Sequence, residues 1–460
     1  MNAVATKLGE LRNDLTGELI LPPDPGYDDA RAIWNAMIDR RPAMIVRCAS
    51  TADVVRAVNY ARDYHMLVSV RGGGHNVAGS ALNDGGMVID MSGMKSVRVD
   101  LESKRATVEA GALLADVDAA TQAHGLATPL GINSTTGVAG LTLGGGFGWL
   151  SRKYGMTVDN LVAAEVVTAD GRVLHASANE HPDLFWALRG GSGNFGVVTR
   201  FEFHLHEVGP NLLAGFVVYP RSQAKSVLAQ YREFIATAPD DLTVWAILRN
   251  APPLPFLPEA VHGTGILVLA MCYAGDPSQG EKLIDPLRKL GTPVGEHVGV
   301  MPYAGWQQAL DPLLAPRARN YWKSHNFTSL ADGLCDVLME TTDALPSPMC
   351  ELILVSMGGA TARPAAETTA YPHRDARFVV NVHSRWEDPA DDARCIAWAR
   401  EFYRAAARFS TGGVYVNFQS EDESERVRAA YGSNYNRLVR VKRMYDPANL
   451  FRVNQNIRPE

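Results

Sequence analysis

Residues 69–79 read Ser-Val-Arg-Gly-Gly-Gly-His-Asn-Val-Ala-Gly, so three glycines and a histidine come directly after a short strand-like stretch. Glycine adopts backbone angles that are closed to other residues, which lets successive N–H groups converge on an anion such as a pyrophosphate. Taken alone, the loop could also be a tight turn, and His75 could be a surface or capping residue. His75 has no carboxylate or second histidine at metal-ligand spacing, so the pattern does not favour a metal site.

Two further glycine loops follow in the same half of the chain. Residues 137–148 read GVAGLTLGGGFG, and residues 189–196 read RGGSGNFG before a strand-like run. Three such loops in one region favour cofactor binding over simple turns. Neither the Walker spacing nor a clean GxGxxG at the start of a helix occurs, which argues against a P-loop enzyme and a Rossmann dehydrogenase.

Composition bounds the class of protein. The 460 residues are enough for two or three packed units, and the 44 basic and 50 acidic residues leave a formal charge of -6 without a basic tract. This balance argues against binding to nucleic acid or to an anionic membrane. The start of the chain lacks the apolar core of a secretory signal, and the longest apolar stretch, 266–274, is too short to cross a bilayer. We therefore expect a cytoplasmic protein.

The cysteines are scattered, odd in number and without CxxC spacing, so we expect reduced core thiols rather than disulfides or a zinc site. They are Cys48, Cys272, Cys335, Cys350 and Cys395.

Hydrophobic patterning divides the chain into three parts, which we expect at residues 1–207, 208–415 and 416–460. In the first part, strand-like residues 43–47 and 67–70 flank an amphipathic helix at 51–65, as in a βαβ unit of an α/β arrangement.

In the second part, strand-like runs alternate with helical segments, which predicts an antiparallel sheet covered by helices. The last part predicts two helices and an extended tail. The segments are the strands 266–273 and 377–383 and the helix 222–236 in the second part, and the helices 424–431 and 434–444 and the tail 451–457 in the last.

Five motifs along the chain make a resemblance specific: RGGGHNVAG at 71–79, GVAGLTLGGGFGWLSRKYGMTVDNL at 137–161, VVTADG at 166–171, DLFWALRGGSGNFGVVT at 183–199 and YGSNYNRLVRVKRMYDPANLFRVNQNI at 431–457. The chain resembles the oxygen-dependent FAD-linked oxidases of the vanillyl-alcohol oxidase superfamily, in the branch of berberine bridge enzyme and the bacterial hydroxynicotine oxidases. The resemblance implies an α+β fold. A two-part FAD-binding domain of the p-cresol methylhydroxylase type (PCMH), formed by the first and last parts, would enclose the cofactor, and the middle part would cover the substrate face.

The resemblance also implies a site. It puts the 8α-methyl group of the flavin on His75, a covalent bond that retains the cofactor and favours oxidation of difficult substrates. The backbone at Arg71, Gly72, Gly73, Gly74 and Asn76 would hold the pyrophosphate. The other contacts expected with FAD are Gly79, Asn133, Thr136, Gly137, Gly140, Thr142, Gly145, Gly193, Asn194, Gly196, Val198, Asn454 and Asn456.

The sequence departs from the family at two positions. Many relatives attach the flavin a second time through a cysteine, where this chain has Asn133, so we expect a single histidyl bond. Alcohol-oxidising relatives place a tyrosine base in a strand near the C-terminus, where Val-Asn-Phe-Gln at 416–419 offers Phe418, which cannot accept a proton.

Another residue must then be the base, or the substrate needs none, as for a neutral amine. Asn381, His383 and Arg385 share one face of an alternating strand, and His383 is the leading candidate because imidazole titrates near neutrality. A structural role for His383 and a contribution from residues 321–325 remain alternatives. Thr136 would lie beside the flavin, where a bulkier aliphatic residue blocks oxygen.

Three functions fit these observations. The leading hypothesis is an oxidase that transfers hydride from a small amine or alcohol to flavin N5 and then reduces O2 to H2O2. The second is a tailoring enzyme of natural-product biosynthesis that uses an oxygenated flavin. The third, motivated by Phe418, is a flavin-binding protein that has lost catalysis.

Overall fold

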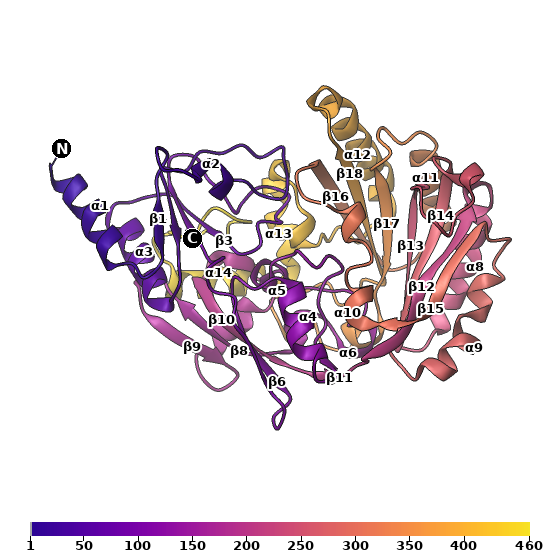
Figure 1. Cartoon of the computed structure of the whole chain (residues 1–460), viewed down its shortest axis with the longest axis horizontal. Coiled ribbons are helices and arrows are strands. Elements are labelled where there is room, and N and C mark those ends of the chain that lie inside the picture. The colour runs from indigo at the N-terminus through magenta and orange to yellow at the C-terminus, as the bar shows by residue number, and fades with distance from the viewer. Residues whose placement is uncertain (1) are drawn as a thin grey trace.

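The computed structural model describes residues 2–460, which form an α+β fold as the sequence predicts. A four-stranded and a five-stranded sheet lie at one end of the elongated molecule and a seven-stranded sheet at the other, with the C-terminal segment returning between them (Figure 1). A two-stranded sheet, formed by Leu126–Ala127 and His206–Glu207, is separate from these three. Within the described residues, no helix is long and apolar enough to span a membrane.

The first sheet has the strand order β1-β2-β4-β3, with β4 parallel to both of its neighbours. The predicted βαβ unit is present, since β2 is followed by α3 and β3, although β4 lies between the two strands. Helix α3 begins after Ser50, whose side chain accepts a hydrogen bond from the N–H of Asp53. The bounds are α1 Asn2–Asp14, β1 Glu18–Ile20, α2 Tyr27–Ala30, β2 Met44–Arg47, α3 Thr51–Asp63, β3 Val68–Arg71 and β4 Met87–Asp90.

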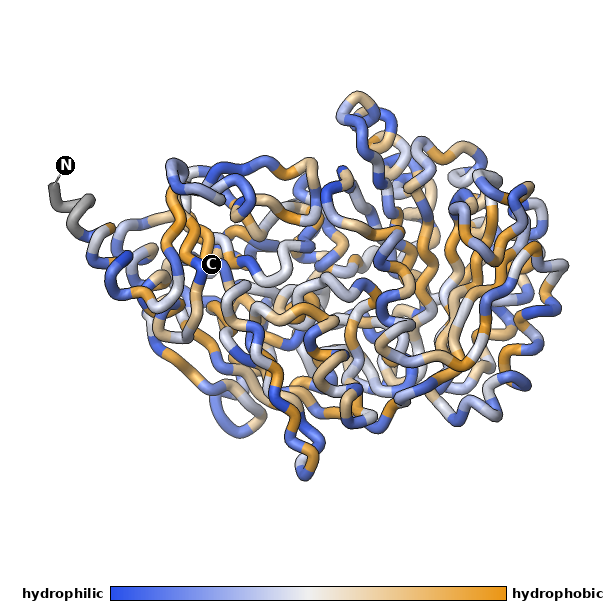
Figure 2. The backbone as a smooth tube through the Cα atoms, viewed as in Figure 1, coloured by the Kyte–Doolittle hydropathy of each residue, from blue (hydrophilic) through white to orange (hydrophobic). Residues whose placement is uncertain are grey.

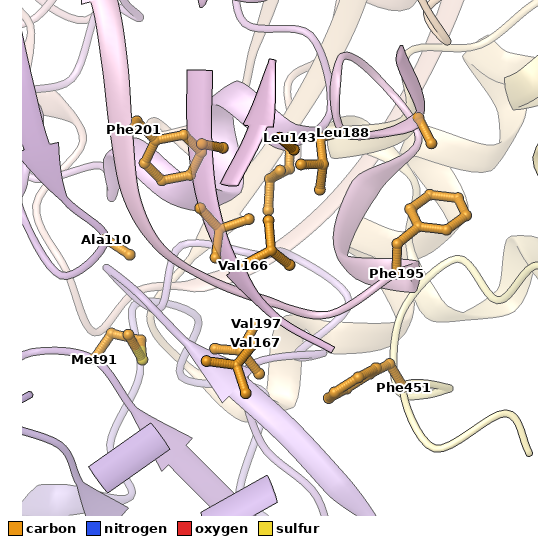
Figure 3. Close-up of a cluster of buried hydrophobic side chains, with 14 of the residues drawn as sticks. Met91, Ala110, Leu143, Val166, Val167, Leu188, Phe195, Val197, Phe201 and Phe451 are labelled. Atoms are coloured by element: carbon orange, nitrogen blue, oxygen red, sulfur yellow. The ribbon is translucent and has the colours of Figure 1, made fainter. Parts of the chain in front are cut away.

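The second sheet is antiparallel, with the order β5-β6-β10-β8-β9. Its apolar side chains pack against the glycine-loop helices and the C-terminal tail, as the cluster of Met91, Val166, Phe195, Phe201 and Phe451 shows (Figure 3). The bounds are β5 Val97–Asp100, β6 Arg105–Glu109, α4 Leu114–Gln122, β7 Leu126–Ala127, α5 Val138–Leu143, α6 Ser151–Tyr154, β8 Leu161–Val167, β9 Val173–Ser177, α7 Pro182–Leu188, β10 Val197–His204 and β11 His206–Glu207.

The third sheet is antiparallel throughout, with the order β15-β12-β14-β13-β17-β18-β16. Its strands are among the most apolar segments of the chain (Figure 2). The bounds are β12 Asn211–Pro220, α8 Ala224–Thr237, β13 Leu242–Asn250, β14 Gly265–Tyr273, α9 Pro277–Arg288, β15 Gly295–Pro302, α10 Tyr303–Trp306, β16 Arg319–Phe327, α11 Asp332–Thr341, β17 Glu351–Ser356, β18 Phe378–Trp386 and α12 Asp392–Ala406.

Side-chain alternation decides which face of this sheet meets which layer. On β18, Phe378, Val380 and Val382 belong to the core under the helices α8, α9, α11 and α12, as predicted for a helix-covered sheet. Asn381 and His383 therefore point to the opposite face, toward the four- and five-stranded sheets.

The C-terminal segment differs in one detail from the prediction. The expected helix 424–431 is a 3-10 helix at Glu421–Arg426 followed by α13 at Val427–Tyr431, and α14 spans Tyr435–Tyr445. Residues Val416–Phe418 form a 3-10 turn rather than a strand, so Phe418 is presented from a turn. The tail at 451–457 has no regular structure, as expected.

Candidate active site

One large cavity lies between the glycine loops and the free face of the seven-stranded sheet. It contains about 1870 Å³ of space free of protein atoms, part of it open to solvent. Its wall comes from the glycine loops, from β17 and β18, from residues 415–418 and from the C-terminal tail. Segments far apart in sequence therefore enclose one site.

The first two glycine loops touch each other through their backbones. A Cβ atom on Gly73 would collide with the backbone of Gly137, and one on Gly137 would collide with Gly73, so only glycine fits at this contact. The N–H groups of residues 72–76 have no acceptor among the described residues. A row of unpaired donors at a cavity wall fits the pyrophosphate of a dinucleotide.

His75 projects from this loop into the cavity. Its Nε2 lies 2.9 Å from Thr135 Oγ1, its Nδ1 lies 3.5 Å from Thr136 Oγ1, and its ring stacks on Trp34 with centroids 5.0 Å apart. Burial, and then the charge of Arg385, lower the pKa of His75 to about 4, and a contact with the backbone of Thr135 opposes this shift. His75 is therefore an uncharged imidazole at neutral pH.

A row of polar side chains crosses the sheet opposite this loop. Trp322, His383, Glu351 and Arg249 are register neighbours on β16, β18, β17 and β13. The rings of Trp322 and His383 are parallel with centroids 4.3 Å apart, and His383 Nδ1 lies 3.3 Å from Glu351 Oε1. Arg249 in turn donates to Glu351 Oε2 at 2.7 Å.

Burial and the neighbouring Glu351 carboxylate shift the pKa of His383 in opposite directions, and the net shift is downward. Burial lowers the pKa of His383, and the adjacent Glu351 carboxylate opposes that shift. Burial raises the pKa of Glu351, but Arg249, His383 and Arg385 together outweigh this effect and hold the pKa below its usual value. His383 is therefore an uncharged imidazole at neutral pH with the Glu351 carboxylate beside it, although its Nδ1 makes a hydrogen bond with none of the described residues.

The other two candidates on β18 lie differently. Asn381 lines the cavity, and neither atom of its side-chain amide has a hydrogen-bond partner among residues 2–460. Arg385 is not part of the wall: its guanidinium lies 4.9 Å from the centroid of Trp34 and donates to Ala315 O at 2.8 Å.

Aromatic side chains form the rest of the substrate-side wall. Phe418 packs edge-on against Tyr415, with centroids 4.8 Å apart, and both contact Phe147. The hydroxyl of Tyr415 accepts hydrogen bonds from Gly146 N at 2.9 Å and Asn417 Nδ2 at 3.0 Å. Because burial raises the pKa of Tyr415 to about 12, this tyrosine does not replace the missing base.

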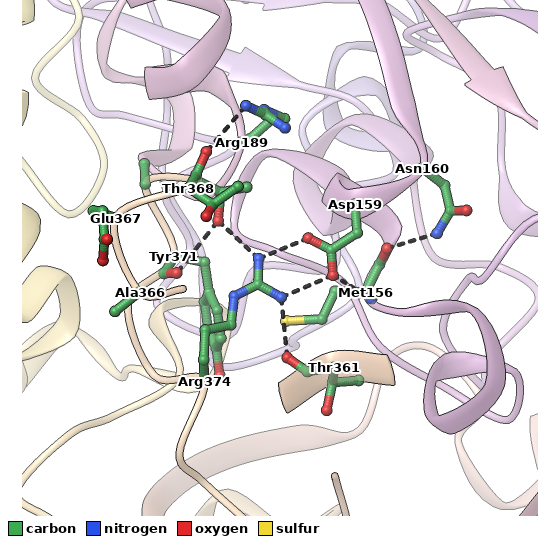
Figure 4. A network of polar contacts seen from close by, with 12 residues as sticks. Met156, Asp159, Asn160, Arg189, Thr361, Ala366, Glu367, Thr368, Tyr371 and Arg374 are labelled. Atoms are coloured by element: carbon green, nitrogen blue, oxygen red, sulfur yellow. Dashed lines mark hydrogen bonds and ion pairs between the residues drawn. The ribbon is translucent and has the colours of Figure 1, made fainter. Parts of the chain in front are cut away.

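Two polar networks hold the cavity wall in place. Arg374 donates to both carboxylate oxygens of Asp159, at 2.8 and 2.7 Å, and to Thr369 Oγ1, which fastens the loop after the second glycine motif to residues 361–374 (Figure 4). At the tail, Asn194 Oδ1 accepts from Ile457 N at 2.9 Å, and Asn454 donates to Gly193 O at 3.1 Å.

Most residues singled out by the sequence meet at this cavity: its wall includes Gly72, Gly73, Gly74, His75, Asn76, Asn133, Thr136, Gly137, Gly140, Gly193, Gly196, Val198, Asn381, His383 and Asn454. The others lie behind the wall. Arg71 pairs with the buried Asp90, Gly145 packs against Met156, and Asn194 anchors the tail. Gly79, Thr142 and Asn456 are likewise not wall residues.

The structure adds residues that the sequence analysis did not single out. Glu351 lies next to His383, Trp34 stacks on His75, and Tyr415 lines the cavity. Each of these contacts joins segments that are far apart in the sequence. For Glu351 a signal existed, because it is a lone charge at the start of the apolar run Leu352–Val355. Trp322 belongs to the segment 321–325, whose Tyr321, Lys323 and His325 face away from the cavity.

Comparisons with known proteins agree with this architecture. A family model described as "FAD binding domain" matches residues 42–177, and one described as "Berberine and berberine like" matches residues 414–458. The chain is 33% identical to the (R)-6-hydroxynicotine oxidase of Paenarthrobacter nicotinovorans over 97% of both chains. It is 28% identical to the chitooligosaccharide oxidase of Gibberella zeae, over 100% of this chain and 96% of that protein.

Solved structures give the same picture. The crystal structure of 6-hydroxy-D-nicotine oxidase from Arthrobacter nicotinovorans has a TM-score of 0.87 and 32% identity, with 97% of this chain and 99% of that chain covered. A BBE-like protein of Physcomitrella patens has a TM-score of 0.88 at 23% identity, over 98% of this chain and 99% of that one, which shows the shared fold.

Proposed function

The chain belongs to the berberine-like family of FAD-linked oxidoreductases, and on that premise we propose that it is an oxidase with its flavin bonded to His75. It would oxidise a small amine or alcohol and return the electrons to dioxygen as hydrogen peroxide. The observation that carries the proposal is that the glycine loop and the sheet place His75 and His383 on the wall of one cavity.

The residues present fit FAD. The unpaired N–H groups of residues 72–76 are donors for a pyrophosphate, and the side-chain oxygen of Asn454 in the cavity wall is buried without a partner among the described residues. When bound, the flavin supplies a two-electron acceptor that dioxygen can reoxidise. We propose that the parts 1–207 and 416–460 enclose the flavin and that 208–415 carries the substrate face.

His383 is the proposed base. It would accept the proton of a substrate hydroxyl or ammonium, while the Glu351 carboxylate holds the ring and Trp322 limits its rotation. Phe418 and Tyr415 supply no base at neutral pH. Asn381, with both amide atoms free, is the proposed hydrogen-bond partner of the reacting amine or hydroxyl group.

The lining limits the substrate. Trp34, Phe147, Trp245, Trp322 and Phe418 make the walls apolar and aromatic, and the polar groups converge at His383 and Asn381. Such a cavity suits a small molecule with an apolar or aromatic body and one amine or hydroxyl end. We propose that this end is oxidised.

Thr136 supports reaction with oxygen. It lies in the wall 3.5 Å from His75 Nδ1, and its side chain is smaller than the leucine or isoleucine that would fill the space beside the flavin. Thr136→Ile should slow reoxidation of the reduced flavin by oxygen without a comparable loss in flavin reduction. Stopped-flow traces with unchanged reoxidation would remove Thr136 from the proposal.

The central test joins two measurements. The purified protein should stay yellow after acid precipitation, and His75→Ala should release its flavin. A panel of amines, alcohols, phenols and sugars should contain compounds that bleach the flavin anaerobically and yield one peroxide per turnover in air. Flavin that washes out in acid contradicts the covalent bond, and reduction without peroxide contradicts the oxidase.

A further inference from the structure

We propose that Asn133 and Thr135 are positioning residues that hold His75 with its proton on Nε2 and its lone pair on Nδ1, so that Nδ1 bonds the flavin. The inference rests on the proposed attachment of the flavin to His75 and assigns a role to the residue that stands in place of a second, cysteine attachment. It concerns how the enzyme is assembled, not how it turns over.

The direction of the hydrogen bonds begins at Asn133. The N–H of Thr135 donates to Asn133 Oδ1 at 3.0 Å, and Asn133 Nδ2 faces the carbonyl of Leu314 at 3.4 Å. A backbone N–H is always a donor and a carbonyl always an acceptor, so these two bonds fix the orientation of the amide. Oδ1 is therefore the atom that faces Thr135.

The hydroxyl of Thr135 has one proton to give. It lies 2.6 Å from Asn133 Oδ1, which can only accept, so the hydroxyl donates there. The same hydroxyl lies 2.9 Å from His75 Nε2, and with its proton committed it must accept from that nitrogen. Nε2 then carries the imidazole proton, and the lone pair is on Nδ1.

The surroundings of Nδ1 agree with this assignment. Nδ1 lies 3.5 Å from the hydroxyl of Thr136, and both His75 and Thr136 belong to the cavity wall. A hydroxyl at this distance is a weak partner, which leaves the Nδ1 lone pair available for a new bond. Nε2 is occupied by Thr135.

Burial, and then the charge of Arg385, keep the ring uncharged. Trp34 stacks on His75, and the guanidinium of Arg385 lies 4.9 Å from the Trp34 centroid, with its Nε and Nη1 lacking partners among residues 2–460. A second positive charge on His75 would be unfavourable beside this buried cation. A protonated imidazole has no lone pair, so an uncharged one is required for bond formation.

Formation of the covalent bond removes two protons and two electrons from the flavin and His75. One C–H bond of the flavin methyl group breaks, and a C–N bond forms to Nδ1. The methyl proton and the Nε2 proton are released. The two electrons pass through the flavin to dioxygen, and with the two protons they give one hydrogen peroxide.

The test compares variants of the whole enzyme. Thr135 is exposed, so Thr135→Val keeps the shape and removes only the hydroxyl, while Thr135→Ser restores it. We expect Thr135→Val and Asn133→Leu to slow covalent attachment about tenfold, the effect of one lost hydrogen bond. Thr135→Ser should attach at the wild-type rate. The matched control is Ser134→Ala, in the same loop as Asn133 and Thr135. It loses a hydrogen bond to the distant Asp311, and its rate of covalent attachment should also be unchanged.

Two readouts decide the outcome. The first is the acid-stable fraction of the bound flavin, followed over time in excess FAD. The total amount of bound FAD, measured in parallel, shows whether the variant is correctly folded. The second is NMR of the isolated flavin peptide, which should show the bond at Nδ1. Attachment at Nε2, or wild-type kinetics in Thr135→Val, overturns this inference alone. A wild-type enzyme without acid-stable flavin overturns the proposed attachment and this inference together, whereas its peroxide yield is measured independently.

Discussion

The charged cluster at Lys442 in the C-terminal helix and the cluster at His383 in the sheet are both buried, but they differ in how fully their hydrogen bonds are made. Lys442 Nζ donates to Asn194 O at 2.7 Å, Phe451 O at 2.9 Å and Asp446 Oδ2 at 2.6 Å, which uses all three protons. Asp446 also accepts from the N–H groups of Leu450 and Phe451. This cluster fastens the tail and leaves no polar atom of either side chain free.

The sheet cluster is incomplete by contrast. Neither amide atom of Asn381 has a hydrogen-bond partner among the described residues, nor has Nδ1 of His383, which lies 3.3 Å from Glu351 Oε1. Each unmet polar group costs about 1–3 kcal/mol when buried. The completely paired cluster therefore has a structural role, whereas the free polar atoms at the cavity wall are available to a bound substrate, as proposed above for Asn381.

The largest expected effect is on catalysis at the incomplete cluster. His383→Asn should lower the rate of flavin reduction by roughly 10²–10⁴-fold, the usual contribution of a general base. His325→Asn is the matched control, because His325 bonds Tyr403 O away from the cavity. Reduction at the wild-type rate in His383→Asn would discard the base and favour an amine that binds uncharged.

The pH profile of the wild type tests the same residue. The base acts when uncharged, so kcat/KM should rise with pH. Because burial lowers the pKa of His383, the rise should lie below about 6.5, the ordinary value for histidine. A rise at alkaline pH would instead report the ionisation of an amine substrate.

The complete cluster should respond through stability. Lys442→Met leaves the Asp446 carboxylate buried without its cation, and we expect a loss of about 3–5 kcal/mol in the free energy of unfolding. Arg443→Met removes the same charge at an exposed neighbour and should change little. Equal denaturation midpoints for the two variants would contradict a structural role for the buried Lys442–Asp446 pair.

Asp118 is a buried carboxyl outside the cavity wall, and only one of its two oxygens is hydrogen-bonded. Its carboxyl accepts from Gln307 at 3.1 Å, its Oδ1 has no partner within the described residues, and burial raises its pKa to about 7. The unfolded carboxyl titrates near 3.9, so its stability contribution is full below about pH 4 and is lost as the pH rises through about 7.

Replacing this carboxyl removes the buried charge. Asp118→Asn should therefore stabilise the protein at pH 8, by up to about 4 kcal/mol, and much less at pH 5. Thermal unfolding of both proteins at the two pH values measures the difference. A gain that is the same at pH 5 and pH 8 would show that the charge of Asp118 is not the cause.

The smallest effect is expected at the surface of the same helix that holds Lys442. Arg437 pairs with Asp183 at 3.2 Å and lies 3.9 Å from the Trp186 ring centroid, but its side chain is 38% exposed. Arg437→Gln should cost about 0.5–1 kcal/mol, less in high salt. Arg440→Gln, at an exposed position without an ion pair in the described part of the chain, is the control. A cost near that of Lys442→Met would contradict the role assigned to burial.

Much of the fold could be predicted because its signals are local. The helix expected at 51–65 is α3, and the strand expected at 266–273 is β14, since apolar periodicity and capping act within a few residues. The 3-10 geometry at Glu421–Arg426 differs from the expected α-helix at 424–431. In this segment Asp422 and Glu423 pair with Lys323 on the distant strand β16, a contact that local sequence cannot reveal.

The parts of the site that lie within one loop could be predicted from the sequence alone. The glycines at 72–74 and His75 are adjacent in the chain, so local backbone chemistry predicts the anion cradle, whereas flavin attachment at His75 is implied only by the family resemblance. The tertiary structure is needed to see that Glu351 lies beside His383 and pairs with Arg249. It is also needed to see that Trp34 lies between His75 and Arg385. The physical reason is register: alternation tells which face of a strand a residue is on, but a partner strand can be paired in many registers, and only packing of the whole sheet selects one.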